Sequence, residues 1–192
     1  MDTTKELIEA IKTKKASKQM ATETNAKSFS LISDRIIKLC NYRIQQEEYS
    51  SRLYLAMSKW LENKGYLGAA KLWKKYSDEE LSHAEIIYGF LLDLGIQPEV
   101  PELSKPKQDY TGLVEIVNAS YEHEVDIYKQ CSELAKASYE ENQLMLYPIA
   151  LKLTQEQSEE LSKLQNWIDM FASFGTEQIT LLHIDEKMGN MV

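Results

Sequence analysis

WKKYSDEELSHAEIIYGFLLDL, residues 73–94, is the stretch that decides the fold. Its large apolar side chains recur at alternating steps of three and four residues, which places them on one stripe of a helix. Glu80 and His83 interrupt the middle of this stripe. An ionised carboxylate in an apolar seam is costly unless it is paired or bound to a metal ion. The pair alone is weak evidence, because a Glu three residues before a His occurs by chance in many helices.

Length, composition and charge narrow the range of folds and partners. The 192 residues suffice for one domain with a sizeable core, and two very small domains are the less favoured alternative. Gly and Pro are scarce and no strand-like alternation is present, so we expect an all-α protein. A formal net charge of −8 argues against nucleic acid and anionic membranes as main partners, and it suits a protein that handles cations.

The cysteines and the N-terminus indicate the compartment. Cys40 and Cys131 are far apart in the sequence and fall on apolar stripes, so we expect reduced core residues. No apolar run reaches membrane-spanning length, and the N-terminus lacks the apolar core of a secretory signal. We therefore predict a cytoplasmic protein.

Three further segments share the helical spacing of residues 73–94. We expect four long helices, at about 34–64, 67–94, 111–141 and 144–174. Each apolar seam is interrupted near its middle by ionisable or amide groups, which besides Glu80 and His83 are Glu47, Glu124, and Glu160 with Gln157.

The connections predict how these helices are joined. Residues 95–109 contain three prolines and no apolar period, so they form an extended connection long enough to run the length of a bundle. Gly175 ends the fourth helix and a short fifth helix follows, at 176–189. The predicted fold is a four-helix bundle over residues 31–192, with one long crossover between helices two and three. Residues 1–30 read as a polar, flexible extension.

In such a bundle the four interruptions can come to one level. Four carboxylates and an imidazole in an apolar core predict a di-metal site, because two divalent cations balance four negative charges and oxygen-rich ligation suits iron or manganese. Glu47, Glu80 and His83 would hold one ion. Glu80, Glu124 and Glu160 would hold the other, which we expect to bind more loosely.

Other residues border the predicted centre. Tyr54 can hydrogen-bond a ligand or take part in redox chemistry, or it can be a plain core residue. Three more carboxylates can hold a third ion or remain solvated: Glu79, Glu156 and Glu159. His123 points away from the seam and His183 lies in the last helix, so we expect neither to be a ligand.

Five motifs in order resemble the ferritins, and more closely the bacterial non-haem type. They are EEYSSRLYLAM at 47–57, DEELSHAEIIY at 78–88, YEHE at 121–124, EQSEE at 156–160 and LLHIDEKMG at 181–189. The similarity covers about residues 31–192, and the extension has no counterpart. The fourth helix has Gln-x-x-Glu instead of a second Glu-x-x-His, which disfavours the haem-binding bacterioferritins and the di-iron oxygenases.

The resemblance implies a hollow cage of 24 copies that oxidises iron(II) with dioxygen or peroxide and stores iron(III) mineral. It implies that the two ligand groups above form a ferroxidase centre, with Gln157 and Tyr54 beside it. It also implies a third iron site at Glu79, Glu156 and Glu159, together with Glu160. The alternatives are a di-iron oxidase acting on a small organic substrate, and a structural cage that has lost oxidation.

Overall fold

The structure is a computed structural model that describes residues 30–192. These residues form five helices and no strand: α2 (Asp34–Asn63), α3 (Leu67–Asp93), α4 (Leu113–Glu140), α5 (Leu146–Phe174) and α6 (Gln178–Gly189). The all-α prediction and the helix bounds are thereby confirmed. Almost all of the predicted extension, residues 1–30, lies outside the described residues. Within the described part, no helix is long and apolar enough to cross a membrane.

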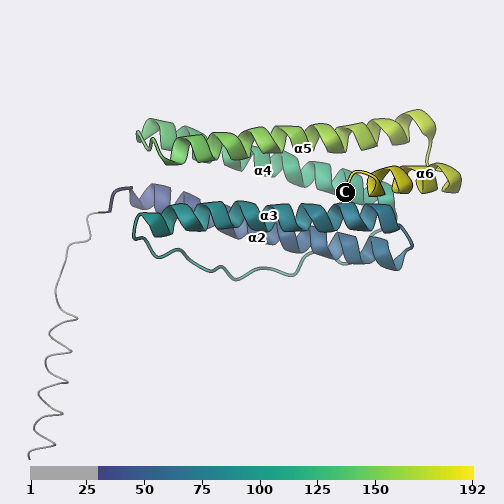
Figure 1. The fold of residues 1–192 in the computed structure, drawn as a ribbon, viewed down its shortest axis with the longest axis horizontal. Helices are drawn as coiled ribbons and strands as arrows, with labels where there is room; N and C mark the ends of the chain where they lie inside the picture. Colours follow the sequence, from purple (N-terminus) through teal and green to yellow (C-terminus); the bar gives the residue numbers. More distant parts are fainter. Residues whose placement is uncertain (1–29) are drawn as a thin grey trace, which may run out of the picture. The chain divides into compact units, whose positions relative to one another are not determined.

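The bundle consists of two helical hairpins that pack against each other, α2 with α3 and α4 with α5 (Figure 1). The long crossover, predicted at residues 95–109, spans residues 94–112 and runs beside α2. The amide of Gln45 on α2 donates a hydrogen bond to the Glu102 carbonyl at 3.3 Å, and the Glu99 N–H donates to Asn41 at 3.1 Å. This path lets α4 begin beside the C-terminal end of α2, where Trp60 packs edge-on against Tyr110.

The apolar core has two clusters, one toward each end of the bundle. The first includes Leu61, Trp73 and Trp167. The second includes Ile44, Ile87 and Leu153, among others. Between the two clusters, each of the four long helices places at least one buried polar side chain on its inner face, among them Glu47, Glu80, Glu124 and Gln157. The sequence pattern of seams interrupted at mid-length thus becomes one polar layer between two apolar clusters.

The short helix α6 docks on the beginning of α3. The Asp185 carboxylate accepts hydrogen bonds from the backbone N–H groups of Gly68 and Ala69, at 3.2 and 2.7 Å. These N–H groups have no partner within their own helix, so Asp185 caps α3 from another element. Gly68 allows this approach, because a Cβ there would lie 1.9 Å from the Asp185 carbonyl oxygen.

Candidate metal centre

The polar layer brings together the ionisable residues that the sequence placed in mid-seam. Glu47 comes from α2, Glu80 and His83 from α3, Glu124 from α4 and Glu160 from α5. Glu47, Glu80 and Glu124 are at most 1% exposed, and His83 is 7% exposed. Glu160 is only partly buried, so the α5 side is the more open one.

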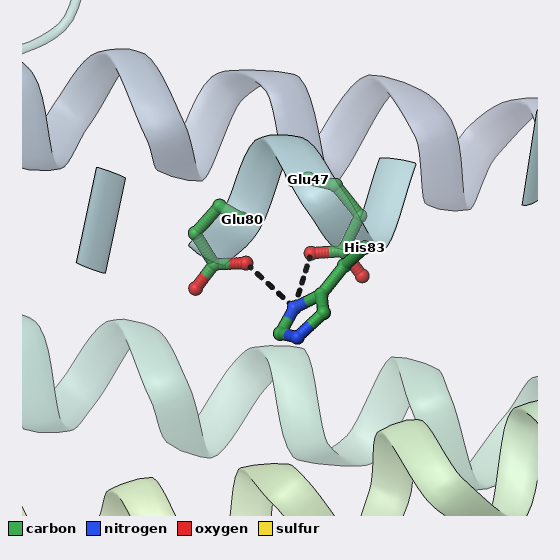
Figure 2. Close-up of side chains that lie close together, drawn as sticks. All are labelled: Glu47, Glu80 and His83. Carbon is green, nitrogen blue, oxygen red and sulfur yellow. Dashed lines mark ion pairs between the residues drawn. The ribbon is translucent and has the colours of Figure 1, made fainter. Parts of the chain in front are cut away.

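The first ligand group is formed by Glu47, Glu80 and His83, whose donor atoms all lie within 4.8 Å of one another. Figure 2 shows both carboxylates directed at one nitrogen of the imidazole ring. The His83 Nδ1 atom lies 3.4 Å from a Glu80 oxygen and 3.9 Å from a Glu47 oxygen. Two carboxylate oxygens and an imidazole nitrogen form a ligand set that suits a divalent transition metal.

The second ligand group is formed by Glu80, Glu124 and Glu160, with one oxygen from each again within 4.8 Å of the others. Glu80 therefore belongs to both groups. A carboxylate has two oxygens with lone pairs, so it is able to bridge two cations. The pair of groups sharing Glu80 provides adjacent positions for two metal ions.

Several atoms in this layer that could bind a metal ion have no hydrogen-bond partner. They are buried atoms of the predicted ligands: Glu47 Oε2, Glu80 Oε2, Glu124 Oε2 and His83 Nδ1. The Gln157 side-chain oxygen, from a residue 1% exposed, is unpartnered as well. Buried polar atoms in folded proteins almost always have partners, so a cluster of unpartnered oxygen and nitrogen atoms is the chemistry of a site that binds cations. The residues present fit a bound pair of metal ions.

The pKa values of the buried carboxyl groups also fit a layer that binds cations. Burial, with the charge of neighbouring carboxylates, raises the pKa of Glu80 well above its usual range. Burial also raises the pKa of Glu124 to about 7 and that of Glu160 to about 9. Without bound cations the layer would retain protons near neutral pH, because so many negative charges cannot coexist in it. Divalent cations would replace these protons.

Arg43 is part of this layer, although the sequence pattern did not predict it there. It is 1% exposed, its Nε atom donates a hydrogen bond to Glu47 at 2.8 Å, and its Nη1 atom donates to Gln130 of α4 at 2.6 Å. Burial works against ionisation of Glu47, but the Arg43 guanidinium, together with the neighbouring Glu80 and His83, outweighs it and lowers the Glu47 pKa. The available signal was the spacing, since an arginine four residues before a mid-seam glutamate faces it on the helix.

The remaining predicted site residues lie around the layer. Tyr54 is 2% exposed and its hydroxyl donates a hydrogen bond to Glu124. Glu156 places an oxygen 3.6 Å from the second ring nitrogen of His83. Glu79 is partly exposed and Glu159 is exposed, and the described residues do not bring these two and Glu156 into a third close ligand group.

The two other histidines of the described chain, His123 and His183, lie outside both ligand groups. His123 is hydrogen-bonded to Ser50 at 2.7 Å, and burial lowers its pKa to about 4. His183 is exposed on α6 and lies 3.4 Å from Glu186.

A known family shares both this fold and this chain's sequence pattern. The family model for the ferritin-like domain matches residues 37–173. The chain belongs to the ferritin family. Among its ferritin relatives, a probable bacterial non-heme ferritin-like protein of Haemophilus influenzae is 29% identical over 161 residues, which cover 84% of this chain and 98% of the relative. A bacterial non-heme ferritin of Escherichia coli is 27% identical over the same lengths.

Solved ferritin structures share the fold of this chain. An open pore ferritin from the hyperthermophilic archaeon Archaeoglobus fulgidus superposes with a TM-score of 0.79 and 25% identity, covering 82% of this chain and 96% of the other. Membership of the ferritin family confirms the resemblance drawn from the five motifs, and the shared fold confirms the predicted bundle with its single long crossover.

Proposed function

We propose that this ferritin-family protein oxidises iron(II) at the polar layer and stores the resulting iron(III) as mineral inside a cage of 24 copies in the cytoplasm. The observation that carries the proposal is the sharing of Glu80 between two buried ligand groups with unpaired donor atoms. The names of the relatives support it, since they are called non-heme ferritins.

In the proposed reaction, iron(II) is the substrate and the chain supplies position and charge. Glu47, Glu80 and His83 bind one ion, and Glu80, Glu124 and Glu160 bind the other. Each iron(II) gives up one electron. Dioxygen that takes both electrons and two protons becomes hydrogen peroxide, whereas hydrogen peroxide as the oxidant becomes two molecules of water. The redox chemistry belongs to iron, and the protein holds the pair in place.

The residues next to the two groups have proposed roles of their own. Tyr54 holds the Glu124 carboxylate in place through its hydroxyl. Gln157 offers its unpaired oxygen beside the second group. The more accessible carboxylates, Glu79, Glu156 and Glu159, lie toward the open side and receive iron that leaves the centre. Iron(III) leaves on this side because Glu160 is the least buried ligand.

A single substitution tests the site. We expect Glu80→Ala to abolish the fast phase of iron(II) oxidation, because both positions lose a ligand. The rate is measured in a stopped-flow instrument through the absorbance of the iron(III) formed. The matched control is Glu85→Ala, which removes an exposed glutamate from the same helix and should leave the rate unchanged. An initial rate in Glu80→Ala equal to that of the unmodified protein would show that oxidation happens elsewhere.

A further inference from the structure

Arg43 places a fixed positive charge inside a layer that is otherwise built to attract cations. Its side chain is 1% exposed, and two helices hold it, through Glu47 on its own helix and Gln130 on α4. The third nitrogen, Nη2, is buried and has no partner. An arginine keeps its charge at all pH values at which proteins fold, so this charge is permanent.

This charge changes the balance of the layer. Four ionised carboxylates would neutralise two divalent ions, but Arg43 offsets one of the four negative charges. With two divalent ions bound, the layer then has a small positive net charge, and with two trivalent ions bound its positive net charge is much larger. The Coulomb repulsion between a fixed charge and an ion is proportional to the charge of the ion. A trivalent ion therefore experiences one and a half times the repulsion of a divalent ion in the same place.

We propose that the fixed charge of Arg43 makes the centre discriminate against its own oxidised product, by weakening the binding of iron(III) more than the binding of iron(II). The inference rests on the proposed function. It adds a reason for the product to leave, because oxidation itself raises the charge of each ion and so increases the repulsion. Arg43 acts through the repulsion that its charge exerts on the bound ions, and it does not bind them itself.

A purely structural role for Arg43 predicts a different outcome. If the guanidinium only held Glu47 in place, its removal would loosen a ligand and weaken the binding of every cation. If Arg43 acts through its charge, a neutral side chain strengthens the binding of cations, and more so for trivalent ones. The ratio of trivalent to divalent affinity therefore separates the two roles without relying on the rate of oxidation.

The experiment uses Mn²⁺ and Tb³⁺, which are ions of different charge that both prefer oxygen ligands. Both are titrated into the metal-free protein, Tb³⁺ by its luminescence and Mn²⁺ by electron paramagnetic resonance. The signal that disappears in Glu80→Ala identifies ions bound at the centre. The variants are Arg43→Gln, which is neutral and still polar, Arg43→Met, which is neutral and of similar length, and Arg43→Lys, which keeps the charge. Arg35→Gln is the matched control, since it removes an exposed charge from the same helix.

The expected result is a larger increase in affinity for Tb³⁺ than for Mn²⁺ in the neutral variants. A single positive charge about 6 Å from a bound ion lowers the affinity for a divalent ion about tenfold even at the dielectric constant of water, and the affinity for a trivalent ion about thirtyfold. Removal of the Arg43 charge should raise the two affinities accordingly. Arg43→Lys and Arg35→Gln should keep the original ratio. In Arg43→Gln, a second addition of iron(II) should also be oxidised more slowly than the first, because iron(III) stays bound.

Two results would overturn the inference: lower affinity for both ions in folded neutral variants, or an equal change for both. Circular dichroism shows whether each variant folds. If Arg43→Gln does not fold, the affinities of Arg43→Met provide the test. If neither ion gives a signal that depends on Glu80 in the unmodified protein, the proposed function fails at an earlier step, so the two failures are distinguishable.

Discussion

Glu80 shows how a single side chain acquires a role from its surroundings. Its carboxylate lies in both ligand groups, is 1% exposed and has an oxygen without a partner. Burial next to Glu47 and Glu124 disfavours its ionised form, which is why its pKa is raised. In the absence of metal, protons therefore take the place of cations in this layer.

The retained protons predict a dependence of stability on pH. Burial raises the pKa of Glu124 from 4.5 to about 7 and that of Glu160 from 4.5 to about 9. At pH values between 4.5 and these raised pKa values, the folded chain binds protons that the unfolded chain has released. The free energy of unfolding of the metal-free protein should therefore fall as the pH rises from about 5 to 9. Chemical denaturation at several pH values measures this slope.

Two comparisons check the assignment of that slope. Glu160→Gln carries a neutral amide at all pH values, so it should flatten part of the slope. Saturating Mn²⁺ should also reduce the slope, because bound cations stabilise the ionised carboxylates in the folded state. A metal-free protein whose stability is unchanged or rises over this range would contradict the account of the buried carboxylates.

The sequence was sufficient to predict Glu47, Glu80, His83 and Glu124 as one cluster, because each is a charged residue on an otherwise apolar seam. It was not sufficient for Arg43, whose long side chain is normally solvated at the edge of a seam. Only the packing of α4 against α2, which places Gln130 next to the guanidinium, shows that Arg43 is enclosed. The spacing places Arg43 next to Glu47 on one helix face, but whether the pair is buried depends on contacts between helices.

At the scale of the helices, local sequence signals predict most of the helix boundaries. Ser33 caps α2, as its position before an apolar repeat predicts, and its hydroxyl accepts a hydrogen bond from the Ile36 N–H at 3.2 Å. Pro148 lies in the first turn of α5, where its missing N–H has no cost. The cap of α3 could not be predicted in this way, because Asp185 is more than a hundred residues away in the sequence.

The docking of α6 depends on this distant cap. Replacing Asp185 by Ala leaves two N–H groups at the start of α3 without their acceptor and should cost about 2 kcal/mol of stability. Unfolding by guanidinium chloride, followed by circular dichroism, measures the loss. Glu186→Ala is the control, since this neighbouring carboxylate is exposed and should contribute little. Equal stability of Asp185→Ala and the unmodified chain would show that α6 is held by its apolar face alone.

At the scale of the whole molecule, the two apolar clusters separated by a polar layer explain how a stable bundle tolerates buried charge. The clusters supply the packing, and the layer is confined to one level between them. The family and the exposed apolar side chains, among them Leu55 and Leu81 on the α2–α3 hairpin, support assembly of many copies.

Size-exclusion chromatography of the native protein tests the assembly. A chain of 22.2 kDa that forms the proposed cage should elute as a particle of several hundred kilodaltons. Iron added to that particle should remain with it as a mineral, followed by absorbance across the elution profile. A dimer without retained iron would instead favour a di-iron oxidase, and a large particle that loads no iron would favour a structural cage.

The proposed function requires that acidic side chains from four helices meet around two cations. Crystals soaked in iron(II) without oxygen, with diffraction data collected at the iron absorption edge, show where the iron binds. Two anomalous peaks are expected, one among Glu47, Glu80 and His83, and one among Glu80, Glu124 and Glu160. A map in which iron occupies only exposed carboxylates, with neither of these positions filled, would contradict the account.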